Sequence, residues 1–145
     1  MRLAVLDTNV IVSAAIEPQG APSHLIRDWV LPGQLHIVTS PAIVAEYRDV
    51  MHRPKFSRYG FPPVWLNLLL ERSLHLPDDT EWPHELPDSD DARFLSAAYT
   101  AHACLVTGNM KHFPDSLRNG VEVLTPAQYV RALLSLSETP WSTRT

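Results

Sequence analysis

Acidic residues that could hold a metal ion stand at three separated points of the chain. Asp7 directly follows a short apolar run, Glu46 lies in the segment after a second such run, and Asp91 precedes a third apolar segment. Carboxylate oxygens are the ligands that Mg²⁺ prefers. An ion held in this way can activate water and offset charge on a phosphodiester. The joint placement predicts one metal site with Asp7, Glu46 and Asp91 as metal ligands and catalytic residues.

Each acid also has an ordinary structural explanation when it is taken alone. Asp7 could cap a helix, Glu46 could face solvent, and Asp88, Asp90 and Asp91 could complement the positive end of a helix dipole. The metal-site hypothesis therefore depends on all three ligands converging.

A second polar segment is expected at the end of another strand. Thr107 and Asn109 follow an apolar run, and a hydroxyl and an amide there could position a water molecule or a phosphate oxygen. His112 lies close by and is a candidate for substrate contact. An ordinary strand-to-loop turn is the alternative interpretation.

The most basic stretch leaves two interpretations open. Its cations could contact RNA phosphates, or they could simply follow the end of a helix, where the helix dipole favours them. The stretch contains Arg48, His52, Arg53, Lys55 and Arg58.

The elements that must position these residues alternate along the chain. Short apolar runs predict buried parallel strands at residues 3–6, 35–38, 74–76, 103–106 and 121–124. Helical spacing and capping residues predict helices at residues 10–30 with a loop at 17–22, from 41 to about 52, from 62 to about 70, from 91 to about 101, and from 126 to about 136.

This alternation predicts an α/β fold, a three-layer α/β/α sandwich around a parallel sheet of four to five strands. Ligands of such sheets bind beyond the carboxyl ends of the strands. The first and fourth strands should be neighbours, since Asp7 and Asn109 can meet only then. We expect one domain at residues 1–138 and a flexible C-terminal tail at 139–145.

Composition excludes several classes of protein. The chain has 145 residues, of which 45% are hydrophobic and 19% charged, and its net charge of −4 argues against an architectural DNA-binding protein. One cysteine, Cys104, excludes a disulfide framework and a cysteine-based zinc site within the monomer. Without a signal sequence or an apolar run of about 20 residues, a cytoplasmic protein with no membrane contact is expected.

Five segments in order resemble the successive motifs of PIN domains. They are residues 5–10, 40–47, 88–95, 105–113 and 121–129, which read VLDTNV, SPAIVAEY, DSDDARFL, LVTGNMKHF and VEVLTPAQY. The greatest similarity is to the PIN toxins of bacterial toxin–antitoxin pairs, the VapC type and its relatives.

The resemblance implies an endoribonuclease that uses Mg²⁺ or Mn²⁺, whose three most constant acids match Asp7, Glu46 and Asp91. It implies an RNA substrate, a cognate antitoxin as a possible partner, and a homodimer. Asn109 occupies a position that is often acidic in the family. It offers a neutral oxygen, so the number of metal ions stays open, as do the RNA target and the existence of an antitoxin.

Other classes of protein fit less well. Haloacid-dehalogenase phosphatases need a second Asp two residues after the first, where this chain has Asn9. No Gly-x-Gly-x-x-Gly motif follows the first strand, which disfavours a dinucleotide-binding fold. A PIN scaffold that binds RNA or a protein partner without cutting is the main alternative to a nuclease, and its support is Asn109.

Overall fold

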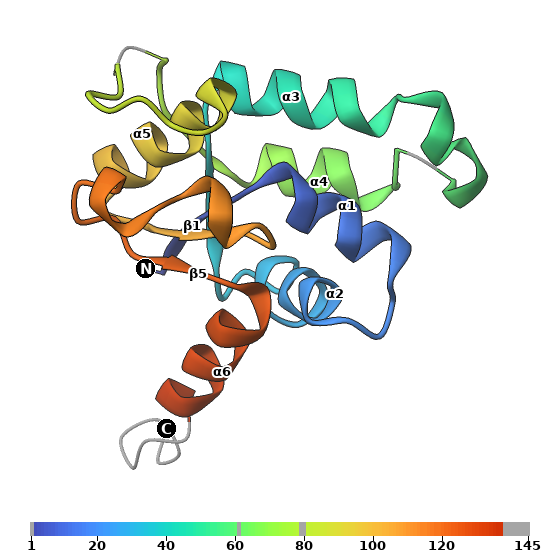
Figure 1. Ribbon diagram of the computed structural model, residues 1–145. Coiled ribbons are helices and arrows are strands. Elements are labelled where there is room, and N and C mark those ends of the chain that lie inside the picture. Colours follow the sequence, from blue (N-terminus) through green and yellow to red (C-terminus); the bar gives the residue numbers. More distant parts are fainter. Residues whose placement is uncertain (1, 61, 79–80, 138–145) are drawn as a thin grey trace.

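The fold is built on a parallel sheet of five strands (Figure 1). The computed structural model describes residues 2–60, 62–78 and 81–137. Every strand pair is parallel, and the order across the sheet is β3-β2-β1-β4-β5. The strands are β1 (Leu3–Leu6), β2 (His36–Thr39), β3 (Leu74–His75), β4 (Cys104–Val106) and β5 (Val123–Leu124). The predicted sheet and the pairing of the first strand with the fourth are both confirmed.

The centre of the sheet is apolar because it is covered on both faces. Val5 and Leu6 of β1 and Leu105 of β4 are fully buried, which explains their continuous apolar runs. Leu6 is in register with Val106, so β1 and β4 end at the same level. From β1 the chain order runs outward through β2 to β3, and from β4 it runs the other way to β5. The topological switch point therefore lies between β1 and β4, where ligands of open α/β sheets bind.

Helices complete a three-layer α/β/α sandwich (Figure 1). Helix α5 packs against β1, β2 and β4, while α2 packs against α6. The α-helices are α1 (Thr8–Ile16), α2 (Ala21–Leu25), α3 (Pro41–Met51), α4 (Trp65–Glu71), α5 (Ala92–Ala101) and α6 (Pro126–Ser137). The shorter helical turns are η1 (Ile26–Val30), η2 (Pro54–Tyr59), η3 (Ser89–Asp91), η4 (Met110–His112) and η5 (Asp115–Leu117).

The loop predicted at residues 17–22 is wrong at its last two residues. Helix α2 already begins at Ala21, with Pro22 in its first turn. Proline is tolerated there because the first N–H groups of a helix have no partner within it. The π-helical turn η1 lies within the helix predicted to end at residue 30. The 3₁₀ turns are not predicted, because segments of three to six residues carry too little periodicity.

The C-terminal part of the chain is described only up to α6. Helix α6 ends at Ser137, close to the predicted end. The predicted domain boundary at residue 138 and the predicted tail at 139–145 lie outside the described residues. Among the described residues, the helices are all too short or too polar to cross a lipid bilayer.

Candidate metal centre

Asp7 lies at the carboxyl end of β1 and is almost completely buried, with 5% of its surface exposed. The hydroxyl of Thr107 donates a 2.8 Å hydrogen bond to Oδ2 of Asp7, and Nδ2 of Asn9 lies 3.1 Å from the same oxygen. Burial raises the pKa of Asp7, and the hydrogen bond from Thr107 partly opposes that rise. The end of β4 thus holds the carboxylate at the end of β1.

The loop after β4 is tied to the start of α1. The amide N–H of Gly108 donates to Oδ1 of Asn9 at 2.9 Å, and the amide of Asn109 donates to Oγ1 of Thr107 at 3.0 Å. A Cβ atom at Gly108 would lie 3.3 Å from Oδ1 of Asn9, so a side chain there would crowd this contact. Thr107 thus reaches Asp7 directly, whereas the observed hydrogen bond of Asn109 uses its backbone.

Glu46 reaches the same region from the next helix. Ser40 caps α3 by accepting from the amide of Ile43 at 3.3 Å, and Pro41 occupies the first turn, where proline is favoured. The hydroxyl of Thr8 donates to Oε2 of Glu46. Burial raises the pKa of Glu46, and the charge of Asp7 raises it further, while the bond from Thr8 lowers it.

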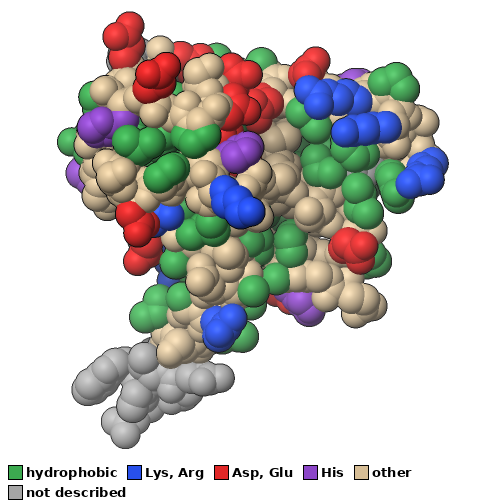
Figure 2. Space-filling view, in the orientation of Figure 1, with side chains coloured by type: hydrophobic (Ala, Val, Ile, Leu, Met, Phe, Trp, Pro, Cys, Tyr) green, Lys and Arg blue, Asp and Glu red, His purple; other side chains and the backbone are tan. Residues whose placement is uncertain are grey.

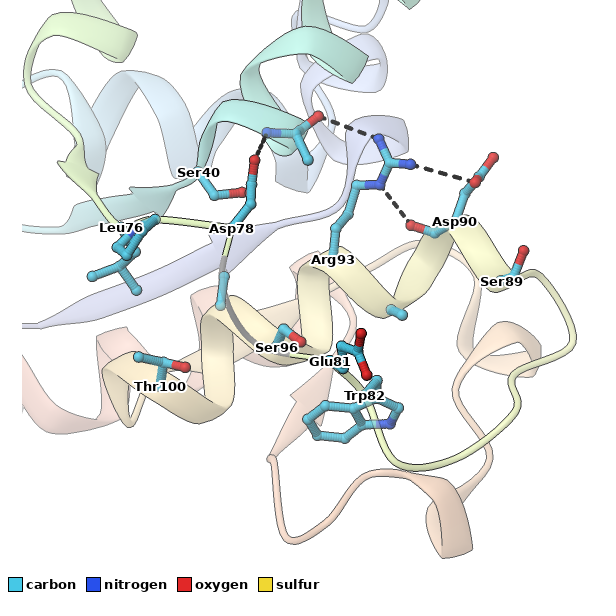
Figure 3. A pocket seen from close by; sticks show the side chains of 14 residues that line it. Ser40, Leu76, Asp78, Glu81, Trp82, Ser89, Asp90, Arg93, Ser96 and Thr100 are labelled. Carbon is cyan, nitrogen blue, oxygen red and sulfur yellow. Dashed lines mark hydrogen bonds and ion pairs between the residues drawn. The ribbon is translucent and has the colours of Figure 1, made fainter.

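Arg93 joins Glu46 to the segment that carries the third acid. Its Nη1 atom lies 3.8 Å from Oε1 of Glu46 and donates to the carbonyl of Ala42 at 3.3 Å. Its other nitrogens contact the backbone and side chain of Asp90 (Figure 3). The side chain also lines a pocket of about 460 Å³ between the start of α3 and the face of α5. Arg93 therefore connects the first turns of α3 and α5.

Asp91 ends the 3₁₀ turn η3 and is 7% exposed. Nδ1 of His112 lies 2.7 Å from Oδ2 of Asp91, yet this buried oxygen accepts no well-formed hydrogen bond among the described residues. Burial, followed by the charge of Asp7, raises the pKa of Asp91 to about 6, and the nearby His112 opposes that rise. A buried carboxylate with an unsatisfied oxygen lies at this point.

The three predicted ligands share one end of the sheet, but they do not form the tightest cluster. The charge of Asp7 raises the pKa values of both Glu46 and Asp91. Within the part of the chain that the structure describes, the group whose ligand atoms all lie within 4.8 Å of one another is instead Asp88, Asp91 and His112. Asp91 thus belongs to both groups, the three predicted ligands and the cluster with Asp88 and His112.

These residues fit a divalent cation. Burying several carboxylates beside one another is unfavourable while they are charged, which the raised pKa values of Asp7, Glu46 and Asp91 express. The buried Oδ2 of Asp91 accepts no hydrogen bond among the described residues, although Nδ1 of His112 lies 2.7 Å away. A bound cation would supply a partner for this oxygen and reverse the unfavourable electrostatics.

Sequence reasoning missed four residues around the site. Thr8 and Asn9 are adjacent to Asp7 but contact partners 38 and 99 residues away, and Arg93 reaches Glu46 across the fold. The sequence indicates a helix cap at Asp88, and its Oδ1 does accept from the amide of Asp90 at 3.0 Å. Its approach to His112 became visible only in the structure. The one available signal was adjacency in sequence to a predicted ligand.

Comparison with known proteins identifies the family. The family model described as PIN domain matches residues 3–111, about three quarters of the chain. The chain belongs to the PIN domain family. Uncharacterized protein MJ1680 of Methanocaldococcus jannaschii is 31% identical over 109 residues, covering 72% of this chain and 69% of its own length.

Solved structures of other proteins share this fold. The crystal structure of VapBC2 from Rickettsia felis bound to a promoter DNA fragment has a chain with a TM-score of 0.58 and 19% identity, covering 85% of this PIN domain protein and 98% of that chain. The crystal structure of FitAcB from Neisseria gonorrhoeae has a chain with a TM-score of 0.54 and 20% sequence identity. The match covers 86% of this protein and 98% of that chain. At these identities the likeness concerns the fold.

Proposed function

We propose that this PIN domain protein is a metal-dependent endoribonuclease that hydrolyses RNA phosphodiester bonds, with Asp7, Glu46 and Asp91 as its catalytic metal ligands. The observation that carries the proposal is the position of Asp7 at the switch point of the sheet, where its charge acts on both of the other acids. Perturbed pKa values of this kind are typical of functional sites.

The chain's own residues have distinct tasks in this proposal. A bound Mg²⁺ or Mn²⁺ ion would activate water and offset charge on the phosphate. Thr107 holds the Asp7 carboxylate, and Thr8 holds that of Glu46, through the hydrogen bonds described above. We propose that Asn109 and His112 orient water or phosphate beside these ligands.

RNA would approach along a face where the two kinds of charge are separated. Figure 2 shows acidic side chains gathered where α3 and α5 begin, with Lys and Arg side chains over the far end of α3. Arg53 there is paired with Asp49 at 3.2 Å, while Lys55 and Arg58 lie on η2. These cations support the proposal that the basic stretch contacts RNA phosphates, because phosphate contacts position a nucleic acid without reading its sequence.

We further propose that the protein is the toxin of a toxin–antitoxin pair. The support is the family together with the fold shared with VapBC2 and FitAcB. A cognate antitoxin, a homodimeric state and a cytoplasmic location belong to the same proposal. Co-purification of the protein with the product of a neighbouring small reading frame, and loss of RNA cleavage in that complex, would test it.

Cleavage of an RNA panel by the purified protein tests the nuclease proposal. Wild-type protein should cut RNA with Mg²⁺ or Mn²⁺ and lose activity in EDTA. Asp7→Asn keeps the shape of the side chain and removes a full charge, so cleavage should fall by a factor of roughly 100 or more, the size of effect expected for catalytic groups. Asp28→Asn, at an exposed acid paired with Arg27, is the matched control and should leave cleavage unchanged.

Two outcomes would count against the nuclease. Asp7→Asn could cut as well as wild type with the same metal dependence, which would remove Asp7 from the mechanism. Alternatively, the wild-type protein could bind RNA without any metal-dependent cleavage, as the scaffold interpretation expects. Circular dichroism of each variant separates loss of activity from loss of folding.

A further inference from the structure

We propose that Asp88, Asp91 and His112 form a binding position for a first-row transition-metal dication, selective for Mn²⁺ over Mg²⁺, beside the Asp7 and Glu46 carboxylates. The inference deepens the proposed function, on which it rests for its purpose, by naming the kind of metal that this end of the sheet selects.

The turn η3 brings the carboxylates of Asp88 and Asp91 close together. The amide of Asp91 donates to the carbonyl of Asp88 at 3.1 Å, which closes the 3₁₀ turn. The ligand atoms of Asp88 and Asp91 lie within 4.8 Å of each other, so both carboxylates face the same space. Asp88 uses Oδ1 to accept from the amide of Asp90, and its second carboxylate oxygen can still act as a ligand.

The histidine comes from the segment after β4. His112 ends η4, where its amide donates to the carbonyl of Asn109 at 3.1 Å. The next residue, Phe113, is fully buried and anchors the turn, and its carbonyl accepts from Nε of Arg118 at 2.7 Å. These contacts hold the backbone that carries the imidazole. The ligand atom of His112 lies within 4.8 Å of those of Asp88 and Asp91.

The unsatisfied Oδ2 of Asp91 supports a cation bound between Asp88, Asp91 and His112. The side chain of Asp91 is 91% buried, and its Oδ2 accepts no well-formed hydrogen bond from the described residues although Nδ1 of His112 is 2.7 Å away. A buried acceptor left in this state is costly. A dication between the carboxylates and the imidazole would satisfy the oxygen and use both ring and acid as ligands.

The nitrogen in this ligand set decides the class of metal. Mg²⁺ takes oxygen ligands and binds imidazole poorly, whereas first-row transition metals accept mixed nitrogen and oxygen ligands. Mn²⁺ also keeps the oxygen preference that suits Asp88 and Asp91. The site should therefore bind Mn²⁺ more tightly than Mg²⁺, and by a margin that depends on His112.

Metal titration of the intact protein without RNA tests this inference. Calorimetry with Mn²⁺ and with Mg²⁺ gives the preference for Mn²⁺ in wild type, in His112→Asp and in Asp90→Asn. His112→Asp exchanges the ring for a carboxylate and should reduce the preference about tenfold or more, the scale on which changes around a metal site act. Asp90→Asn alters an exposed acid between the two ligands, so it is the matched control and should leave the preference unchanged.

A spectroscopic measurement reports the ligand directly. Pulsed electron paramagnetic resonance of the Mn²⁺-loaded protein should show coupling to a ¹⁴N nucleus in wild type and Asp90→Asn, and no such coupling in His112→Asp. If His112 only forms an ion pair with Asp91, the preference for Mn²⁺ will be the same in His112→Asp and wild type, and wild type will show no ¹⁴N coupling. Either result overturns the inference.

The two proposals can fail separately. An RNA cleavage assay on the same samples reports the nuclease, while calorimetry and ¹⁴N coupling report the metal position. Cleavage that depends on Asp7 together with an unchanged metal preference in His112→Asp overturns the inference and leaves the nuclease standing. A nitrogen-coupled Mn²⁺ ion in a protein that cuts no RNA supports the inference and contradicts the nuclease.

Discussion

At the scale of single residues, the site is a set of acids that the folded chain holds at an energetic cost. Asp7 and Asp91 are both buried, and each lies within the electrostatic reach of the other. The bond from Thr107 to Asp7 and the pair between Arg93 and Glu46 offset part of this cost. Natural proteins often carry such unfavourable groups at functional sites, where a ligand later relieves them.

Asp91 should make the metal-free protein less stable as the pH rises. Its pKa is about 6 in the folded protein and near 3.8 in the unfolded chain, so the folded state holds the proton more tightly. Stability from this group is then present below about pH 4 and is lost as the pH rises through about 6. The loss is on the order of 2–3 kcal/mol at pH 7.

Urea denaturation in EDTA measures this effect. The side chain at position 91 cannot ionise in Asp91→Asn. The free energy of unfolding of this variant should therefore rise relative to that of wild type between pH 4.5 and 7. Comparing the two proteins cancels the contribution of groups that they share. Parallel pH profiles for wild type and Asp91→Asn would show that the raised pKa is not present in solution.

At the scale of elements, the sequence predicts the strands well and the side-chain contacts between elements less well. Continuous apolar runs such as Leu3–Leu6 identify the buried strands, and the capping residue Ser40 identifies the start of α3. Acids at strand ends and helix starts predict Asp7, Glu46 and Asp91 as one group, and their shared role as ligands stays a prediction. Which side chains they contact was not predictable, because Arg93 meets Glu46 only after α3 and α5 have packed.

Tyr47 links α3 to the end of β1 and should matter for both stability and function. Its ring is fully buried, and its hydroxyl donates a 2.5 Å hydrogen bond to the carbonyl of Leu6, beside Asp7. Tyr47→Phe keeps the packing and leaves that carbonyl without this donor. The free energy of unfolding should fall by about 1–2 kcal/mol, measured by urea denaturation.

Tyr99→Phe provides the control for this change. Tyr99 is 51% exposed on α5, so removing its hydroxyl should change stability by less than about 0.5 kcal/mol. Because Glu46 precedes Tyr47 on the same turn of α3, RNA cleavage should also fall in Tyr47→Phe and stay constant in Tyr99→Phe. Equal stabilities of the two variants would mean that the hydroxyl of Tyr47 does not hold α3.

At the scale of the whole molecule, the topology concentrates charge that the chain as a whole does not carry in excess. The net charge is only −4, yet the switch point between β1 and β4 collects carboxylates from three separate segments. The same end of the sheet receives His112 from the segment after β4. Parallel strands make this possible, because all their carboxyl ends meet at one edge.

Metal binding at that edge should therefore stabilise the entire domain. An ion that binds only the folded state adds about 2.7 kcal/mol to the free energy of unfolding at a concentration 100 times its Kd. For a domain of this size that corresponds to a rise in Tm of roughly 8 °C. Protons compete for Asp91, whose pKa is about 6, so the rise should be smaller at pH 5 than at pH 7.5.

Thermal unfolding with added MnCl₂ measures this stabilisation, and KCl at the same ionic strength controls for screening of the acids by salt. The double variant Asp7→Asn with Asp91→Asn loses the repulsion among Asp7, Glu46 and Asp91 and lacks two ligands, so its Tm should respond much less to Mn²⁺ than that of wild type. It should also start from a higher Tm than wild type in EDTA. If KCl raised the Tm of wild type as much as MnCl₂ does, the acids would be responding to ionic strength alone, and the edge of the sheet would hold no specific ion.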